Sequence, residues 1–448
     1  MATTDADPAR GVALDVLAAV RERDAYVNLL LPALLAERRI AGRDAAFATE
    51  LTAGTLRLRG RYDAILASLV GRPLAALDPA VLDVLRLGCH QLLSLRTPAH
   101  AAVSTSVDLV RSRVSRRPAG LVNAVLRRVA GADSDTWIDR VAPDRAADPF
   151  GHLAIRHSHP RWIVDALHAA LGGDLDETER LLAADNDPPP VTLVARPGLA
   201  TRDELVVEGA TPGPWSPYAV RLAGGNPADV PAVREGRAGV QDEGSQLVAL
   251  ALAAAPLDGP DRRWLDLCAG PGGKAALLTG LAADRDVLLL ANDRQPHRAR
   301  LAARAVGAST AARVVVGDGT VPAWRRDTFD RVLVDAPCTG LGALRRRPEA
   351  RWRRRPDDLG ALTRLQARLL DSALGSTRPG GIVAYATCSP HLAETREIVQ
   401  ARLARDDVEP VDARQVLPEI PDQSDWWLQL WPHRHGTDAM FLALLRRV

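Results

Sequence analysis

The stretch LDLCAGPGGK, residues 265–274, decides the fold of the C-terminal half of the chain. It follows a short apolar run and leads into a run with helical spacing, which predicts a glycine-rich turn between a strand and a helix. Glycines in such a turn let the backbone approach a ligand closely, and they leave amide groups pointing outward at the start of the helix. The stretch therefore predicts a loop that binds an adenosine-type cofactor.

A carboxylate follows this turn at a spacing that suits a ribose. Asp293 lies twenty residues beyond Gly273 and ends the next predicted strand, where a carboxylate commonly accepts hydrogen bonds from ribose hydroxyls. By spacing alone the cofactor could also be NAD, because Gly270, Gly272 and Ala275 satisfy the pattern G-x-G-x-x-A. A glycine-rich turn with no ligand is the remaining interpretation of the same residues.

Five short apolar runs, separated by stretches with helical spacing, predict the strands of one sheet. They are residues 264–267, 287–290, 313–316, 331–334 and 381–385. Continuous apolar strands that alternate with helices predict a parallel sheet covered on both faces. The architecture is then doubly wound α/β, in which ligands bind at the carboxyl ends of the strands.

Two cysteines follow the fourth and fifth of these strands. Cys338 lies in VDAPCTG, residues 334–340, and Cys388 lies in YATCSP, residues 385–390. Both strand ends face the same crevice as the glycine loop, so we expect the two cysteines to converge on one site. A lone cysteine after a strand is more often a small buried apolar residue. Two of them beside a cofactor loop favour nucleophilic catalysis by a thiolate.

Three motifs together resemble a known family. CAGPGGK (268–274), DAPCTG (335–340) and YATCS (385–389) resemble the signature motifs of RNA cytosine-5 methyltransferases of the NOL/NOP/Sun type. The helical N-terminal part resembles the NusB-like RNA-binding domain, and the combination is similar to the Sun/Fmu branch, the 16S ribosomal RNA methyltransferase B family. This resemblance covers essentially the whole chain. It implies S-adenosylmethionine (SAM) as cofactor and methylation of carbon 5 of a cytosine in 16S ribosomal RNA.

The implied reaction gives the two cysteines a purpose. Carbon 5 of cytosine is a poor nucleophile, and addition of a thiolate to carbon 6 makes it electron-rich enough to attack a methyl sulfonium. The resemblance implies that Cys388 is the attacking nucleophile and that Cys338 assists release of the methylated product. Asp335 is expected to hold the N3/N4 edge of the pyrimidine and to stabilise the charge that develops there.

The resemblance also implies the residues of the SAM site. They are Cys268, Ala269, Gly270, Pro271, Gly272, Gly273, Lys274, Asp293, Asp318 and Asp335. Lys274 is the only lysine in the chain, and an ammonium on a flexible stem suits a place where a planar guanidinium would not. The sequence departs from the family pattern where Gly270 replaces an alanine, Thr339 a serine and Thr395 an asparagine. Any role of that asparagine is therefore not carried over.

Three domains are expected along the chain. Residues 1–132 are predicted to form an all-α NusB-like domain, because apolar residues recur at helical spacing and no strand pattern interrupts them. Residues 133–237 are predicted to form a linker and a small α+β intermediate domain. Residues 238–448 are predicted to form an α/β Rossmann-like class I SAM-dependent methyltransferase domain.

Basic residues are concentrated in two regions, although the net charge is only +2. Residues 1–130 contain 18 arginines and 12 acidic residues, with arginine clusters at 57–61 and 111–117. Residues 345–355 contain seven arginines and one glutamate. Such runs are usually solvated faces, but here we expect both regions to contact the RNA backbone, with Trp352 as a base-stacking or packing residue.

Composition excludes several other classes of protein. The chain has four cysteines, Cys89, Cys268, Cys338 and Cys388, and none forms a C-x-x-C pair, so neither a zinc site nor a disulfide scaffold is expected. The N-terminus lacks a basic-then-apolar signal, and no uncharged apolar run is long enough to span a bilayer. We therefore expect a soluble, cytoplasmic monomer with no membrane partner and no metal.

Three alternatives compete with an RNA cytosine-5 methyltransferase of ribosomal RNA. The helical N-terminal part alone would suit an RNA-binding or antitermination module with an inactive methyltransferase domain. A methyltransferase of an exocyclic amine would need an Asn/Asp-Pro-Pro-aromatic loop, where this chain has Asp335-Ala336-Pro337-Cys338. A cytosine-5 methyltransferase of transfer RNA shares the same motifs and differs only in its substrate.

Overall fold

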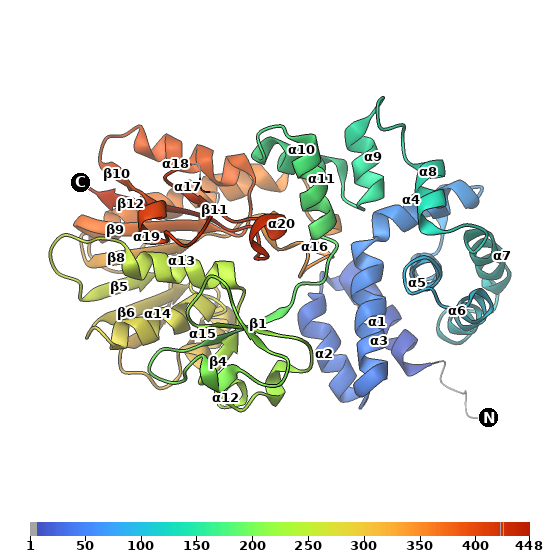
Figure 1. Ribbon diagram of the computed structural model, residues 1–448, viewed down its shortest axis with the longest axis horizontal. Helices are drawn as coiled ribbons and strands as arrows, with labels where there is room; N and C mark the ends of the chain where they lie inside the picture. The colour runs from blue at the N-terminus through green and yellow to red at the C-terminus, as the bar shows by residue number, and fades with distance from the viewer. Residues whose placement is uncertain (1–6, 422, 424) are drawn as a thin grey trace. The chain divides into compact units, whose positions relative to one another are not determined.

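The computed structural model describes residues 7–421, 423 and 425–448, and its ribbon is drawn in Figure 1. The chain divides into two compact units. The helical unit holds the chain up to Pro188 together with Leu344–Arg354. The sheet unit holds Pro189–Ala343 and Arg355–Val448. The segment 133–237, expected as an intermediate domain, is thus divided between the two units after Pro188.

The helical unit contains only helices among its described residues, as the apolar spacing predicts. They are α1 (Pro8–Arg23), α2 (Val27–Glu37), α3 (Gly42–Arg57), α4 (Arg59–Leu69), η1 (Leu74–Ala76), α5 (Pro79–Leu93), α6 (Ala99–Arg113), α7 (Ala119–Val129), α8 (Ser134–Val141), α9 (Pro149–Arg156), α10 (Arg161–Ala170), α11 (Leu175–Ala184) and α16 (Ala350–Arg353). Helix α5 is buried on nearly all sides. Its N-terminus is capped by Asp78, whose carboxylate accepts a hydrogen bond from the Ala80 amide at 2.8 Å.

The arginine-rich segment 345–355 departs from its expected role. Arg351, at its centre, is 0% exposed, and its guanidinium donates to the carbonyl oxygens of Arg57 at 3.0 Å and Asp185 at 2.6 Å. Trp352 donates its indole N–H to the Leu56 carbonyl at 2.8 Å. The expectation that the whole run contacts RNA is wrong for Arg351, because its guanidinium is buried and donates its hydrogen bonds to backbone carbonyls inside the helical unit. Trp352 is a packing residue.

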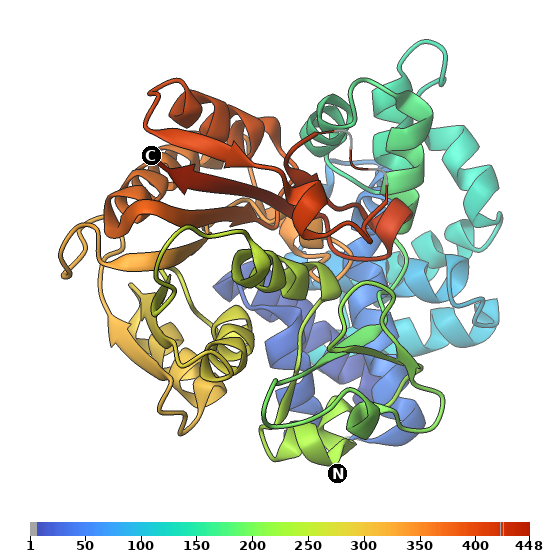
Figure 2. The ribbon, with the colours of Figure 1, turned by 60° about the vertical axis from the view of Figure 1, so that its left-hand side comes forward.

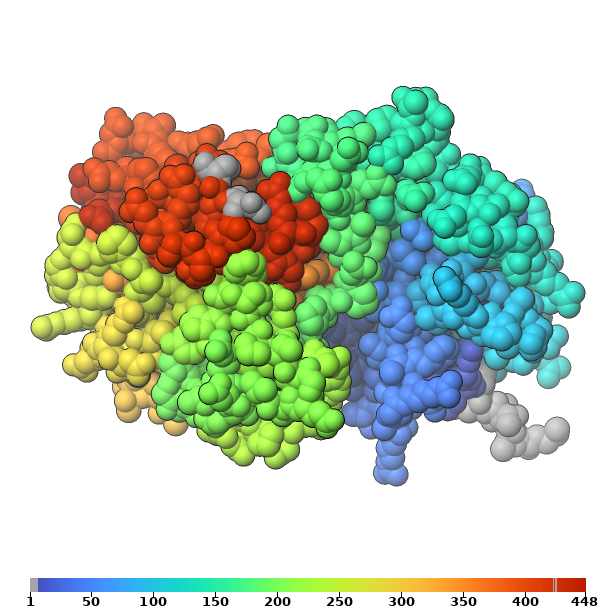
Figure 3. Space-filling view, viewed as in Figure 1, coloured from blue at the N-terminus to red at the C-terminus, as the bar shows by residue number. Residues whose placement is uncertain are grey.

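The sheet unit begins with a small antiparallel sheet. Its strands β1 (Val191–Ala195), β2 (Thr211–Pro212), β3 (Ala219–Leu222) and β4 (Ala238–Val240) lie in the order β2-β3-β1-β4. Short helices η2 (Asp203–Leu205), η3 (Pro227–Asp229) and α12 (Pro231–Arg234) connect them. In Figure 3 this segment, in green, lies beside the C-terminal segment, in red. The indole N–H of Trp215 joins the two by donating to the His435 carbonyl at 2.9 Å.

The large sheet confirms the five predicted strands and adds others. Its order is β10-β12-β9-β8-β5-β6-β7, with β11 paired to β12. The strands are β5 (Arg263–Asp266), β6 (Leu288–Asp293), β7 (Ala312–Val316), β8 (Phe329–Asp335), β9 (Thr377–Thr387), β10 (Val408–Val411), β11 (Leu428–Gln429) and β12 (Phe441–Arg447). Strands β5 to β9 pair in parallel. Strand β12 pairs antiparallel to β9 and to β10, so the sheet is mixed.

Helices cover both faces of this sheet (Figures 1 and 2). They are α13 (Glu243–Ala254), α14 (Gly273–Ala283), α15 (Pro296–Val306), α17 (Asp358–Ser376), α18 (Arg396–Leu403), α19 (Ala413–Val416) and α20 (Pro432–His435). Side chains of a strand alternate between the faces. Trp264 accordingly belongs to the core with α13 and α14, and its neighbour Leu265 belongs to the core with α17. The doubly wound architecture is therefore confirmed.

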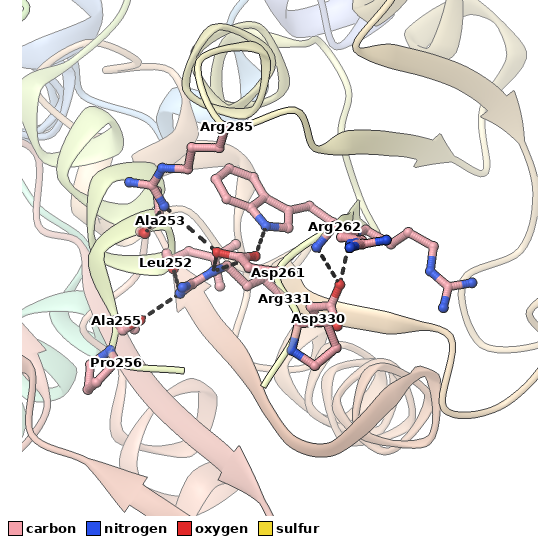
Figure 4. A network of polar contacts seen from close by, with 12 residues as sticks. Leu252, Ala253, Ala255, Pro256, Asp261, Arg262, Arg285, Asp330 and Arg331 are labelled. Carbon is pink, nitrogen blue, oxygen red and sulfur yellow. Dashed lines mark hydrogen bonds and ion pairs between the residues drawn. The ribbon is translucent and has the colours of Figure 1, made fainter. Parts of the chain in front are cut away.

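A polar network secures the amino ends of β5 and β8 (Figure 4). The guanidinium of Arg331 on β8 donates to the carbonyls of Leu252 and Ala255, at the end of α13, at 2.7 Å each. It also donates to the Asp261 carboxylate at 3.0 Å. The Asp330 carboxylate accepts the amide N–H of Arg262 at 2.8 Å. These bonds satisfy carbonyls at a helix terminus and leave the opposite, carboxyl ends of the strands for a site.

Candidate functional site

The glycine-rich loop predicted between β5 and α14 adopts a tightly held conformation. The Ala269 amide donates to the Asn292 carbonyl at 2.8 Å, and the Gly270 amide donates to the Asp293 carboxylate at 2.9 Å. Gly272 has a φ of 112°, and a Cβ there would lie 2.7 Å from the Cα of Ala302. Only glycine suits this position, since both the dihedral angle and the close approach of α15 exclude a side chain.

Asn292 is a site residue that the motifs did not reveal. It is 0% exposed, and its amide Nδ2 donates to the carbonyls of Leu267 at 3.0 Å and Gly317 at 3.1 Å. These carbonyls follow β5 and β7, on either side of β6. The one signal in the sequence is its place directly before Asp293. Asn292 therefore fixes the loops after three neighbouring strands relative to one another.

Two predicted carboxylates stand at the ends of β6 and just beyond β7. Asp293 accepts from the Gly270 amide and, with its other oxygen, from the Gln295 amide at 2.8 Å. Asp318 is partly exposed, and its Oδ1 accepts from the Thr320 amide at 2.9 Å. This backbone hydrogen bond holds the pKa of Asp318 below its usual range. Both carboxylates thus lie at the edge of the sheet where the sequence predicts them.

The chain's single lysine forms an ion pair at the same edge. Lys274 Nζ lies 2.8 Å from Asp335 Oδ2, with side-chain exposures of 10% and 30%. Burial alone would lower the pKa of Lys274, but the charge of Asp335 and its hydrogen bond raise it, with a further contribution from Cys388. The ammonium therefore stays charged and faces two of the predicted site residues.

Asp266 is a second residue of the site, after Asn292, that the motifs did not single out. It ends β5 and is 0% exposed. Burial, followed by the charge of Asp335, raises the pKa of Asp266 to about 7. Close to the Lys274–Asp335 pair the sheet therefore holds a carboxyl group whose pKa lies near neutral pH.

The two predicted cysteines meet. Cys338 follows β8 and Cys388 follows β9, and their sulfur atoms are 3.4 Å apart. The parallel pairing of β8 with β9, which sets Asp335 opposite Ala386, brings the two loops together. The hydrogen bond with Cys388, together with burial, raises the pKa of the Cys338 thiol well above its usual range. Neither of these two cysteines forms a disulfide.

The other two cysteines do not join this pair. Cys268 lies in the glycine loop, where burial raises the pKa of its thiol well above the usual range. Cys89 is 0% exposed in the core of the helical unit, and burial raises the pKa of its thiol too. Both are therefore protonated and unreactive at neutral pH.

The C-terminal segment before β12 packs against the loops that carry Cys338 and Cys388. The Gly342 amide donates to the Cys388 carbonyl at 2.9 Å, and the Ala439 amide donates to the Gly342 carbonyl at 2.8 Å. Gly342 lies in the short helix η4 (Leu341–Ala343). A Cβ at Gly342 would lie 2.0 Å from the Ala439 oxygen. The backbone after Cys338 is therefore packed directly against the backbone before β12.

The polar groups at this edge of the sheet fit an adenosylated amino acid. Asp293 and Asp318 are carboxylates that can accept from hydroxyl and exocyclic amino groups, and Asp335 can accept from an ammonium. The glycine loop presents backbone without side chains beside them. Each of these groups lies at the carboxyl end of a parallel strand, the usual ligand position in such sheets.

The fold and these polar groups define a SAM-dependent methyltransferase of the Rossmann-like class. Residues 251–446 match the family described as 16S rRNA methyltransferase RsmB/F, and residues 7–131 match the NusB family. The chain belongs to the RsmB/F family of 16S rRNA methyltransferases and carries a NusB domain at its N-terminus. Its cofactor is SAM and its substrate is ribosomal RNA, so the NAD alternative is wrong.

Relatives match over nearly the full length. A protein of Mycobacterium tuberculosis (strain CDC 1551 / Oshkosh) named as a methyltransferase is 54% identical, over 99% of this chain and 97% of the relative. Ribosomal RNA small subunit methyltransferase B of Salmonella typhi is 34% identical, over 97% of this chain and 98% of the relative. The resemblance drawn from the three motifs is thus confirmed.

Solved structures share the fold. The crystal structure of PH0851 has a TM-score of 0.81 and 23% identity, covering 99% of each chain. NSun6 from Pyrococcus horikoshii, crystallised with the SAM analogue SFG, has a TM-score of 0.53 and 17% identity, covering 64% of this chain and 98% of its own. No helix in the described part of the chain is long and apolar enough to cross a membrane.

Proposed function

We propose that this methyltransferase modifies carbon 5 of a cytosine in 16S ribosomal RNA through a covalent adduct between Cys388 and carbon 6. The observation that carries the proposal is the 3.4 Å separation of the Cys338 and Cys388 sulfurs beside the Lys274–Asp335 pair. Transfer to an exocyclic amine needs no thiol. Two apposed thiols suit a reaction in which one sulfur adds to the base and must later leave.

The residues of the glycine loop, with Asp293 and Asp318, are proposed to hold SAM. Gly270 to Lys274 would hold its methionine part, Asp293 would accept from its ribose hydroxyls, and Asp318 would accept from its adenine. Bound there, SAM supplies an electrophilic methyl group on a sulfonium. Asp335 is proposed to serve both the cofactor site and the N3/N4 edge of the cytosine, since its carboxylate is partly exposed between them.

The adduct makes carbon 5 of the cytosine more nucleophilic. The Cys388 thiolate adds to carbon 6, and the electrons of the carbon 5–carbon 6 double bond move toward carbon 5. Carbon 5 would take the methyl group as the bond between that group and the sulfonium sulfur breaks, with the electron pair of that bond returning to the sulfur. Carbon 5 then gives up its proton to a base. The electrons of that C–H bond restore the double bond, and the sulfur–carbon 6 bond breaks to return the Cys388 thiolate.

The cysteine pair distributes these roles asymmetrically. Because the hydrogen bond with Cys388 and burial raise the pKa of Cys338, Cys338 keeps its proton, and we assign the attack to Cys388. The Cys338 S–H can then donate a hydrogen bond to the Cys388 sulfur as that sulfur departs from carbon 6. We therefore assign release to Cys338.

A single substitution tests the assignment. Cys338→Ala, incubated with small-subunit ribosomal RNA and SAM, is expected to accumulate a protein–RNA adduct that survives a denaturing gel. The adduct should disappear in the Cys338→Ala, Cys388→Ala double variant. Methyl transfer by Cys388→Ala without any adduct would contradict the covalent mechanism. Absence of methyl transfer in the wild-type protein would favour an RNA-binding module with an inactive domain.

A further inference from the structure

Glu394 is a buried carboxylate next to the cysteine pair to which no role has been given. It ends the short helix η5 (Leu392–Glu394) and is 0% exposed. Its Oε1 accepts the Thr339 amide at 2.8 Å and the Gln366 side-chain amide at 3.0 Å. Its Oε2 accepts the Thr339 hydroxyl. Neutral donors therefore satisfy the carboxylate on both oxygens.

These donors hold the residues on both sides of Cys338. Thr339 directly follows Cys338 and is bound to Glu394 twice. Gln366, on α17, is 0% exposed and uses the same Nε2 to donate to the Pro337 carbonyl, directly before Cys338, at 2.9 Å. The peptide that carries Cys338 is therefore held at its preceding and its following residue by one cluster centred on Glu394.

The same cluster reaches the loop of the other cysteine. The Thr339 hydroxyl lies 3.0 Å from the hydroxyl of Ser389, which directly follows Cys388. The backbone carbonyl of Glu394 accepts the Tyr385 hydroxyl of β9 at 2.8 Å. Through Thr339 and Tyr385, Glu394 thus joins the Cys338 loop to the end of the strand that leads into Cys388.

From this geometry we infer that Glu394 is a positioning residue that holds Cys338 against Cys388 for release of the methylated product. The inference rests on the proposed roles of the two cysteines. Glu394 does not touch substrate, and it acts by fixing the backbone on each side of Cys338. Its loss should impair release more than attack, because Cys388 directly follows the end of β9, whereas Cys338 lies three residues beyond the end of β8.

Four variants separate these steps. Glu394→Ala removes both carboxylate oxygens but keeps the backbone carbonyl that accepts from Tyr385. Glu394→Gln keeps an oxygen for the Thr339 amide and Gln366 while removing the charge. Thr339→Val removes only the hydroxyl link. Glu397→Ala is the matched control, because Glu397 lies one helical turn further on and is exposed. SAM affinity and thermal unfolding are measured for each, so that a folding defect is recognised.

The expected readout is the adduct, not merely a lower rate. Glu394→Ala should accumulate the protein–RNA adduct and lower turnover by about tenfold or more, with SAM affinity unchanged. Glu394→Gln should recover most of that turnover with little adduct, Thr339→Val should show an intermediate amount of adduct, and Glu397→Ala should match the wild type. Loss of turnover without adduct in the alanine variant, or equal loss in the glutamine variant, would overturn the inference.

The cysteine variants keep this test separate from the test of the proposed function. If Cys338→Ala accumulates an adduct and Glu394→Ala does not, the proposed mechanism stands and the inference about Glu394 fails. If Cys338→Ala accumulates none, the proposed mechanism itself fails. If both accumulate an adduct that depends on Cys388, the inference is supported.

Discussion

Asp266 carries the least satisfied charge among the acidic residues at the carboxyl ends of the strands. It is fully buried, neither carboxylate oxygen has a hydrogen-bond partner of normal geometry, and its pKa is raised to about 7. The folded protein therefore binds a proton more tightly at Asp266 than the unfolded chain does. The contribution of Asp266 to stability is present below about pH 4, and it is lost as the pH rises toward 7.

Asp266→Asn should remove this pH dependence. The free energy of unfolding of the variant, minus that of the wild type, should rise by about 3 kcal/mol between pH 5 and pH 8, because the wild type loses about 1.4 kcal/mol per pH unit between pH 5 and pH 7. Urea unfolding at the two pH values measures it. A difference that does not change with pH would contradict the assigned titration of Asp266.

Asp318→Asn is the matched control with the opposite sign. The pKa of Asp318 is lowered by its hydrogen bond to the Thr320 amide, so its contribution is present at neutral pH and lost as the pH falls below its usual range. Its side chain is 42% exposed, and solvent screening should keep the effect well below that of Asp266.

At the residue scale, sequence motifs predicted the residues to which we assign the chemistry and missed those that hold them in place. Cys338, Cys388 and Lys274 stand in short motifs whose spacing along the chain is itself a signal. Asn292 and Glu394 act through hydrogen bonds to segments 25 or more residues away. A single amide or carboxylate has no local pattern that distinguishes it from a surface residue, so these roles needed the tertiary structure.

At the scale of elements, the loop after β8 depends on one glycine. The carbonyl and amide of Gly342 join Ala439 and Cys388, and the backbone of residue 439 lies where a side chain at position 342 would be. The short helix η4 is therefore held by hydrogen bonds between Cys388, directly after β9, and Ala439 of the C-terminal segment.

Gly342→Ala should displace this loop. Overpacking against the Ala439 backbone is expected to lower the free energy of unfolding by about 2–3 kcal/mol and to move Cys338 away from Cys388. Chemical denaturation and methyl transfer to ribosomal RNA measure the two effects. Gly224→Ala, at an exposed glycine with nothing within 4 Å of an added Cβ, should change stability by less than about 0.5 kcal/mol. Equal effects at the two positions would contradict the packing argument.

The parallel strands of the large sheet could be predicted, whereas its antiparallel strands could not. Buried parallel strands are continuous apolar runs bounded by helices, and residues 264–267 and 331–334 show that pattern clearly. Strand β12 ends in two arginines, and β10 has only four residues, two of them exposed. The pairing of β12 with β9 and of β10 with β12 is a long-range event that leaves no period in the sequence.

At the scale of the whole molecule, the chain passes between its two units after Pro188, Ala343 and Arg354. The segment Leu344–Arg354 leaves the sheet unit six residues after Cys338 and packs in the helical unit. Arg351 and Trp352 are its anchors, through carbonyls of Arg57, Asp185 and Leu56. The helical unit thus includes a segment that directly continues the loop carrying Cys338.

A fragment consisting of residues 189–448 should therefore expose this segment. Without residues 1–188, Arg351 and Trp352 lose their hydrogen-bond acceptors, and trypsin should cleave first between residues 345 and 354. In the full chain the same bonds should be protected, and mass spectrometry of a time course identifies the cuts. Cleavage at the exposed Arg325 should be equally fast in both proteins. Equal protection of segment 345–354 in the fragment would contradict the assigned packing.

The interpretation of this segment shows the limit of charge patterns. Seven arginines in eleven residues resemble a surface for a polyanion. Composition does not show which guanidinium is surrounded by carbonyls, and burial lowers the pKa of Arg351 to about 9 while it remains charged at neutral pH. The helical nature of the N-terminal part, in contrast, was predictable, because it depends on local periodicity alone.

Release of tritium from carbon 5 is the most direct test of the central claim. Small-subunit ribosomal RNA carrying cytosines tritiated at carbon 5 is incubated with the protein and SAM, and tritium in water is compared with methyl groups in RNA. The proposed mechanism predicts one tritium released for each methyl group transferred, and neither event with Cys388→Ala. Methyl transfer without tritium release would place the methyl group on another atom and contradict the mechanism.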